Sequence, residues 1–196
     1  MAKSKNVFNS HKLITFTRVF SKCVEVLLWV MTGAMVVFFI VSLANPELVL
    51  DLLAHIYGAG EELNSFGFSM IPAAGESLSG GMLVAFGITA SILCGLMAMT
   101  FRNVYLILQT ADGKTWFAKS QTPFQADIVR MLREIGIFLI SHMAVSTIAV
   151  IVITLIFPNV ELSAGTMSFT LGLLMLCLAQ FFNYGTELEQ DTKGLI

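Results

Sequence analysis

The stretch that decides the fold is IGIFLISHMAVSTIAVIVITLIF, residues 135–157. It contains no Lys, Arg, Asp or Glu, and it exceeds the roughly 20 apolar residues that cross the hydrocarbon core of a bilayer as a helix. The chain as a whole is also apolar, because only 12% of its 196 residues are charged and the mean hydropathy is +0.82. Soluble domains contain about 25% charged residues. The sequence therefore indicates an integral membrane protein.

Three further apolar runs are long enough to span a membrane, at 24–43, 81–101 and 166–184. We predict an all-α fold: one membrane domain over 1–196, a four-helix bundle of two helical hairpins in the lipid bilayer. The first run could also be a cleaved signal peptide, because Ser42-Leu43-Ala44 resembles a cleavage site. We disfavour that interpretation, since the run is too long for a signal core and follows a long charged segment.

The positions of Lys and Arg predict the orientation. They lie before the first run, between the second and third runs, and in the tail: Lys3, Lys5, Lys12, Arg18, Lys22, Arg102, Lys114, Lys119, Arg130, Arg133 and Lys193. The segments 44–80 and 158–165 contain none. Because Lys and Arg are retained on the cytoplasmic side, we expect a plasma (inner) membrane protein with both termini, loop 102–134 and tail 185–196 in the cytoplasm. Segment 44–80 then faces outward.

The segment QTPFQADIVRMLREIG, residues 121–136, carries four charges directly before the third span. Thr122 and Gln125 form a capping box, and Pro123 suits the first helical position. One face is apolar: Phe124, Ile128, Met131, Leu132 and Ile135. The charged residues stay out of the membrane, since each Arg or Asp at its centre costs about 2.5–3.5 kcal/mol. We predict an amphipathic cytoplasmic helix that continues into the third span and offers a partner surface of Asp127, Arg130, Arg133 and Glu134.

Short motifs in this region resemble a known family. GKTWF (113–117) is followed by PF (123–124) and LREIG (132–136), and the end of the fourth span reads FFNYGTELEQD (181–191). This pattern is similar to a family of small bacterial membrane proteins known only as domain of unknown function 2975. The resemblance implies four spanning helices and no known enzymatic activity. It also implies a cytosolic helix-turn-helix regulator as partner, because such proteins are often encoded beside one.

The outer segment 44–80 holds five acidic residues and no basic residue. Asn45-Pro46 followed by apolar residues at helical spacing predicts a short amphipathic helix, on the outer membrane surface or capping the bundle. LNSFGFSMIP, 63–72, is expected to be extended or hairpin-like. Four residues are candidate ligands for a cationic peptide or a metal ion: Asp51, His55, Glu61 and Glu62. We favour the alternative, a solvated loop that lacks Lys and Arg because of topology, and predict no metal site and no cofactor.

His142 is the only ionisable side chain well inside a span. Counting residues from the span ends places Glu25, Gln180 and Asn183 at a similar depth, which defines a candidate intramembrane polar cluster of four residues. Such a cluster could relay a proton or bind a small polar ligand. Alternatively, these side chains form hydrogen bonds that fix helix register. We favour the second interpretation, because transporters usually show broken helices and more intramembrane charge.

Small residues recur at four-residue intervals in two spans. Gly87, Ser91 and Gly95 form a candidate helix-packing seam in the second span, and Ser168 and Gly172 share the spacing in the fourth. Such a seam packs either within the protein or at a homodimer interface. Internal packing is favoured, because four helices must pack against one another.

The sequence contains no motif of a metalloprotease, P-loop nucleotide-binding protein or serine hydrolase. The cysteines Cys23, Cys94 and Cys177 match neither a zinc site nor a disulfide framework. The basic N-terminal segment is interpreted as a topological signal that contacts lipid headgroups, so we expect no direct nucleic-acid binding.

Three functional hypotheses remain. The first is a non-enzymatic sensor or regulatory membrane subunit with a cytosolic partner. The second is a small transport or permeation protein that uses the cluster around His142. The third is a membrane enzyme. Because the sequence contains no recognisable enzyme motif, we predict that the protein is not an enzyme.

Overall fold

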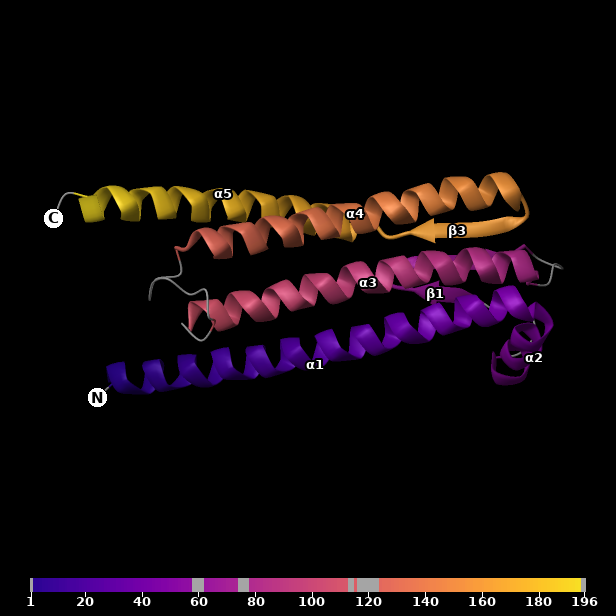
Figure 1. Cartoon of the computed structure of the whole chain (residues 1–196), viewed down its shortest axis with the longest axis horizontal. Coiled ribbons are helices and arrows are strands. Elements are labelled where there is room, and N and C mark those ends of the chain that lie inside the picture. The colour runs from indigo at the N-terminus through magenta and orange to yellow at the C-terminus, as the bar shows by residue number, and fades with distance from the viewer. Residues whose placement is uncertain (1, 58–61, 74–77, 113–114, 116–123, 195–196) are drawn as a thin grey trace. The chain divides into compact units, whose positions relative to one another are not determined.

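A computed structural model describes residues 2–57, 62–73, 78–112, 115 and 124–194. The elements are α1 (Ala2–Ala44), α2 (Pro46–Tyr57), β1 (Leu63–Ser65), β2 (Phe68–Pro72), α3 (Gly80–Ala111), α4 (Ala126–Ile156), β3 (Val160–Ala164) and α5 (Met167–Gly194) (Figure 1). The fold is all-α apart from one small antiparallel sheet.

Four helices are long and apolar enough to cross a membrane, over Ile14–Ala44, Gly80–Ala111, Ala126–Ile156 and Met167–Thr192. They cover the four predicted spans except for Phe157 and Thr166 at the ends of two of them, and the predicted all-α class is confirmed. Each helix extends beyond its apolar run. The hydropathy pattern marks only the part of a helix that tolerates lipid, whereas charged residues outside that part continue the same helix.

Polar caps explain where two helices begin. The Asn45 side-chain oxygen accepts a hydrogen bond from the Leu48 N–H at 3.3 Å, and Pro46 occupies the first position of α2. The Ser79 hydroxyl accepts a bond from the Met82 N–H at 3.3 Å at the start of α3. The predicted helix start at Asn45-Pro46 is therefore confirmed. The predicted capping residues Thr122 and Pro123 lie outside the described residues, but the predicted helix start there is wrong, because α4 begins at Ala126 and Gln125 precedes it.

The sheet has the order β1-β2-β3 and is antiparallel throughout. A two-residue loop joins β1 to β2, with φ of 48° at Phe66 and 80° at Gly67. Positive φ at both positions is the geometry of a type I′ hairpin turn. The hairpin-like conformation expected for 63–72 is thus confirmed. Its pairing with β3, from a segment expected to be a plain outer loop, was not predicted.

The chain divides into two compact units. The basic unit comprises 1–27, 98–139 and 170–196, and the sheet unit comprises 28–97 and 140–169. A core cluster of the sheet unit joins the sheet to α3 and α4: Phe68, Met70, Met82, Phe86, Ala90, Leu93, Ile153 and Val160. A smaller cluster of the basic unit joins α4 to α5 through Ile128, Leu132 and Ala179.

Candidate functional site

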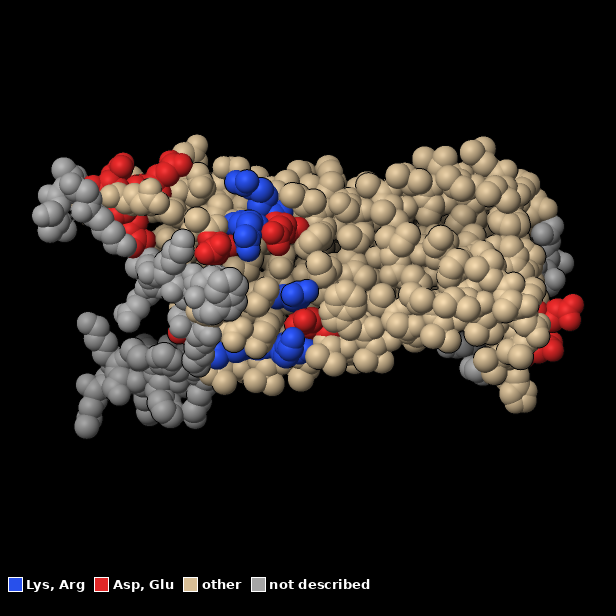
Figure 2. All heavy atoms as spheres, viewed as in Figure 1, with Lys and Arg blue, Asp and Glu red and all other residues tan. Residues whose placement is uncertain are grey.

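Charge is divided unequally between the two units. The basic unit contains all eleven Lys and Arg. Its acidic residues are Glu25, Asp112, Asp127, Glu134, Glu187, Glu189 and Asp191, so its formal charge is positive. The sheet unit contains no Lys or Arg and six acids: Glu47, Asp51, Glu61, Glu62, Glu76 and Glu161. Figure 2 shows blue and red side chains next to one another in the basic unit.

Large apolar side chains are exposed on all four long helices, for example Val30 (67%), Ile92 (47%), Leu155 (80%) and Leu174 (58%). Soluble monomers rarely expose contiguous apolar patches of more than a few hundred Å². Lipid is the environment that such side chains favour, since they lose contact with water there. Together with the lengths of the four helices, this defines a multi-pass membrane protein. No family model, curated protein or solved structure matches the chain.

The first turns of α4 are amphipathic. Ile128, Met131, Leu132 and Ile135 are buried, as the sequence predicts for one face. The Gln125 carbonyl accepts hydrogen bonds from the Ile128 and Val129 N–H groups, which starts the helix. Phe124 packs its ring on Phe182 of α5, with centroids 5.6 Å apart. These contacts determine which side of this part of α4 is buried and which side is exposed.

The four residues of the candidate partner surface differ in their surroundings. Glu134 accepts a hydrogen bond from the Asn103 side-chain nitrogen of α3 at 2.9 Å and pairs with Arg130 at 3.5 Å. Asp127 is half-buried, whereas Arg130 and Arg133 are both exposed. Arg133 has no ion-pair partner in the part of the chain that the structure describes. The two guanidinium groups are therefore the more exposed charges of this surface, although the four residues carry no net formal charge.

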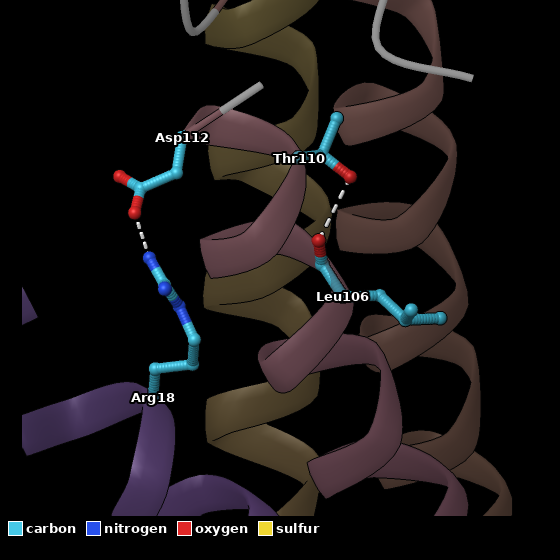
Figure 3. Close-up of polar contacts among 4 residues, drawn as sticks. All are labelled: Arg18, Leu106, Thr110 and Asp112. Carbon is cyan, nitrogen blue, oxygen red and sulfur yellow. Dashed lines mark hydrogen bonds and ion pairs between the residues drawn. The ribbon is translucent and has the colours of Figure 1, made fainter. Parts of the chain in front are cut away.

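Two ion pairs lie in the basic unit, one between α1 and the residue after α3 and one within α1. Arg18 of α1 pairs with Asp112, directly after the end of α3 (Figure 3). Lys22 donates to Glu25 at 2.9 Å and lies 4.9 Å from the centroid of the Tyr105 ring. The buried Thr110 hydroxyl donates to the Leu106 carbonyl at 2.8 Å, which satisfies this polar group within α3 (Figure 3).

Replacement of Lys22 by methionine is expected to reduce stability by about 1–2 kcal/mol, because it leaves the Glu25 carboxylate buried without its cation. Glu25 is only 6% exposed, whereas the lysine side chain is half-exposed and partly screened. The double variant Lys22→Met/Glu25→Leu should recover most of the loss. Apparent melting temperatures in detergent measure both variants. A double variant that is less stable than the single one would contradict the explanation.

The predicted polar cluster falls into separate pairs. Glu25 binds Lys22, and the Asn183 side-chain nitrogen donates to Glu187 at 2.8 Å. Gln180 is exposed. His142 belongs to the sheet unit, and its Nδ1 lies 3.4 Å from the Ser168 hydroxyl at the start of α5. Joint action of the four residues stays a prediction.

His142 is 3% exposed, and its Nε2 atom has no hydrogen-bond partner among the described residues. The structure pairs it with Ser168, which precedes Gln180 by about 18 Å along α5 at about 1.5 Å per residue. The depth estimate from the predicted span ends did not identify Ser168 as a partner, because it placed the start of the fourth span at the outer surface of the membrane.

The small residues of α3 face α1. A Cβ atom on Gly87 would lie 3.1 Å from the Phe39 Cα, and one on Gly95 would lie 3.9 Å from a Thr32 methyl group. The Ser91 hydroxyl donates to the Gly87 carbonyl at 2.7 Å, so its polar group is satisfied within the helix. This seam therefore lies against another helix of the same chain.

Sequence reasoning missed a second close approach, between α4 and α5. A Cβ atom on Gly136 would lie 2.7 Å from the Leu176 side chain and 3.0 Å from the Gly172 carbonyl oxygen. Gly136 interrupts an otherwise large apolar run, and the sequence marks Gly172 only by its spacing from Ser168.

The candidate ligands Asp51, His55 and Glu62 are all exposed, and Glu61 lies outside the described residues. Over the described part of the chain, no group of three or more His, Cys, Asp or Glu side chains could hold a metal ion.

Proposed function

We propose that this protein is a non-enzymatic sensor or regulatory subunit of the bacterial plasma (inner) membrane, with both termini in the cytoplasm. Arg130 and Arg133 form its docking surface for an acidic surface of a cytosolic partner. The observation that carries the proposal is the start of α4, which buries its apolar side within the basic unit and leaves both guanidinium groups exposed. The concentration of Lys and Arg in one unit supports the orientation.

A helix-turn-helix regulator is the partner that the family resemblance favours. Arg side chains suit such an interface, because a planar guanidinium group binds a carboxylate through two parallel hydrogen bonds. Regulation would then couple a change within the membrane to release or capture of the cytosolic protein. The competing role of the two arginines is contact with lipid phosphates, which also attract cations near the membrane surface.

The double variant Arg130→Glu/Arg133→Glu is expected to lose the cytosolic partner when the protein is purified from native membranes with a mild crosslinker. The matched control is Arg102→Glu, which reverses another exposed charge of the basic unit, on α3. The milder Arg130→Gln/Arg133→Gln variant, with an unchanged melting temperature, guards against misfolding. If the same cytosolic proteins were recovered with the Gln variant and the control, the docking surface would be wrong.

A small transport or permeation function is the second candidate. The unpartnered Nε2 of the buried His142 favours it, because an ionisable group in a membrane helix is expensive unless it is used. A His142→Ala variant that is correctly inserted would then lose flux of the transported solute. Unchanged flux of every solute tested would remove the basis of this alternative.

A further inference from the structure

The sheet has two chemically different faces. In the paired register, Leu63, Met70 and Leu162 form one row, and Ser65, Phe68 and Ala164 form the next row on the same face. Phe68 and Met70 are fully buried against the helices of the sheet unit. The opposite face carries the row Asn64, Ser69 and Ser163, followed by the pair Ile71 and Glu161. We call Asn64, Ser69, Ser163 and Glu161 the polar sheet face; Ser69 is buried, and the other three residues are exposed.

The sheet lies deep along the spanning helices. The Ser65 hydroxyl, at the end of the hairpin, lies 3.8 Å from the Cys94 sulfur in the middle of α3. Cys94 is about 21 Å along α3 from its start at Gly80, at about 1.5 Å per residue. The hydrocarbon core of a bilayer is about 30 Å thick. The turn of the hairpin therefore reaches more than halfway along the length that α3 needs to cross it.

The start of α5 provides an independent measure of depth. Ser168, in the first turn of α5, contacts His142, which is about 22 Å along α4 from Phe157. The Gly165 N–H donates to the Gly67 carbonyl at 2.7 Å, so the chain enters α5 directly beside the turn of the hairpin. Strand β3 therefore occupies the outer part of the path that a full-length fourth helix would follow.

Strand β3 is an edge strand. Bonded pairs alternate along an antiparallel ladder. Gly165 bonds to Gly67, and the Ala73 N–H donates to the Asn159 carbonyl at 3.0 Å. By this alternation, the N–H and C=O groups of Val160, Leu162 and Ala164 point away from β2, and none has a strand partner in the described part of the chain.

Lipid is an unfavourable environment for such a strand. Each unsatisfied backbone polar group costs several kcal/mol in the hydrocarbon region, so open sheet edges there line water or protein. Exposed Glu161 and Ser163 would add to this cost. We propose that the polar sheet face and the free edge of β3 contact water admitted from the outer side, deep within the thickness of the membrane. The acidic, base-free character of the sheet unit makes this water-filled space selective for cationic solutes.

Reaction of single cysteines with a charged, membrane-impermeant thiosulfonate tests the proposal. The positions are Ser163→Cys on the polar sheet face and Ile148→Cys on α4, introduced after Cys23, Cys94 and Cys177 are replaced by alanine. Ile148 is 60% exposed and about 14 Å along α4 from Phe157, so it is exposed as Ser163 is, but as an apolar residue of a spanning helix it is expected to face lipid. The reagent is applied to the side on which Glu62→Cys reacts, which makes the result independent of the proposed orientation.

We expect Ser163→Cys to react at least about tenfold faster than Ile148→Cys, because only a hydrated thiol ionises to the reactive thiolate. Equal protection of both cysteines would show that lipid or protein covers the sheet, and would overturn the proposal. Equal reaction of both would show that this part of the chain lies outside the membrane, and would also overturn it. Labelling after denaturation shows that each cysteine is present.

Charge selectivity is tested by comparing cationic and anionic reagents at Ser163→Cys. The cationic reagent should react faster, and Glu161→Gln should reduce this preference, because the two residues lie about 7 Å apart on one face of β3. The control Glu47→Gln removes an exposed acid of the sheet unit on α2 and should change the preference less. An anionic reagent that reacted as fast as the cationic one would overturn the selectivity.

Discussion

A leucine at position 136 is expected to prevent the close approach of α4 and α5 and to destabilise the basic unit. Even a Cβ atom there would lie 2.7 Å from Leu176 side-chain atoms and 3.0 Å from the Gly172 carbonyl oxygen. The Leu176 side chain can rotate away, but the carbonyl belongs to the backbone of α5, so the helices must separate. Overpacking of this kind costs about 1–3 kcal/mol or more. We expect the apparent melting temperature in detergent to fall by about 5 °C or more.

The matched control is Gly33→Leu. A Cβ atom on Gly33 would meet nothing within 4 Å, and the residue lies in a membrane-spanning helix as Gly136 does. The control should therefore insert and fold like the unmodified protein. Comparable loss of stability in both variants would mean that removing a helical glycine, rather than crowding Gly172 and Leu176, causes the effect.

The four spans were predictable because their signal is local. Each requires about 20 apolar residues, and no long-range partner is needed to recognise it. The amphipathic start of α4 was predictable for the same reason, since the spacing of Ile128, Leu132 and Ile135 alone defines the buried face. The pairing of Arg130 with Glu134 is likewise local, because residues four apart on a helix are neighbours.

The sheet could be predicted only in part. LNSFGFSMIP suggests a hairpin, but Phe66-Gly67 lacks the Asn-Gly or Asp-Gly signal of a type I′ turn. β3 is only five residues long, and its partner β2 is far away in the sequence. Such pairing depends on tertiary packing, including the stacking of Phe68 on Phe86 of α3, which no sequence window contains.

The candidate site shows the same limit. Depth counted from span ends placed His142 near Gln180, whereas the structure gives His142 the partner Ser168. The difference arises because β3 runs along the helices before α5 begins, so that α5 starts beside His142. Residue spacing fixes neighbours within a helix, but the relative register of two helices depends on contacts such as Gly136 with Gly172.

Side-specific labelling of two cysteines is expected to give an all-or-none result. In a background without Cys23, Cys94 and Cys177, an impermeant thiol reagent added outside intact cells should modify Glu62→Cys and spare Thr115→Cys. The physical reason is the charge distribution. Every Lys and Arg belongs to the unit that contains Thr115, and none belongs to the unit that contains Glu62. Retention of cations in the cytoplasm then orients the whole chain.

Permeabilised cells provide the control, because the reagent should then modify the cysteine at position 115 as well. Modification of position 115 and protection of position 62 in intact cells would place the basic unit outside. The exposed Arg130 and Arg133 would then face the wrong compartment for a cytosolic partner, and the proposed docking function would fail. Modification of both positions in intact cells would instead indicate two opposite insertions, which the strong bias of Lys and Arg argues against.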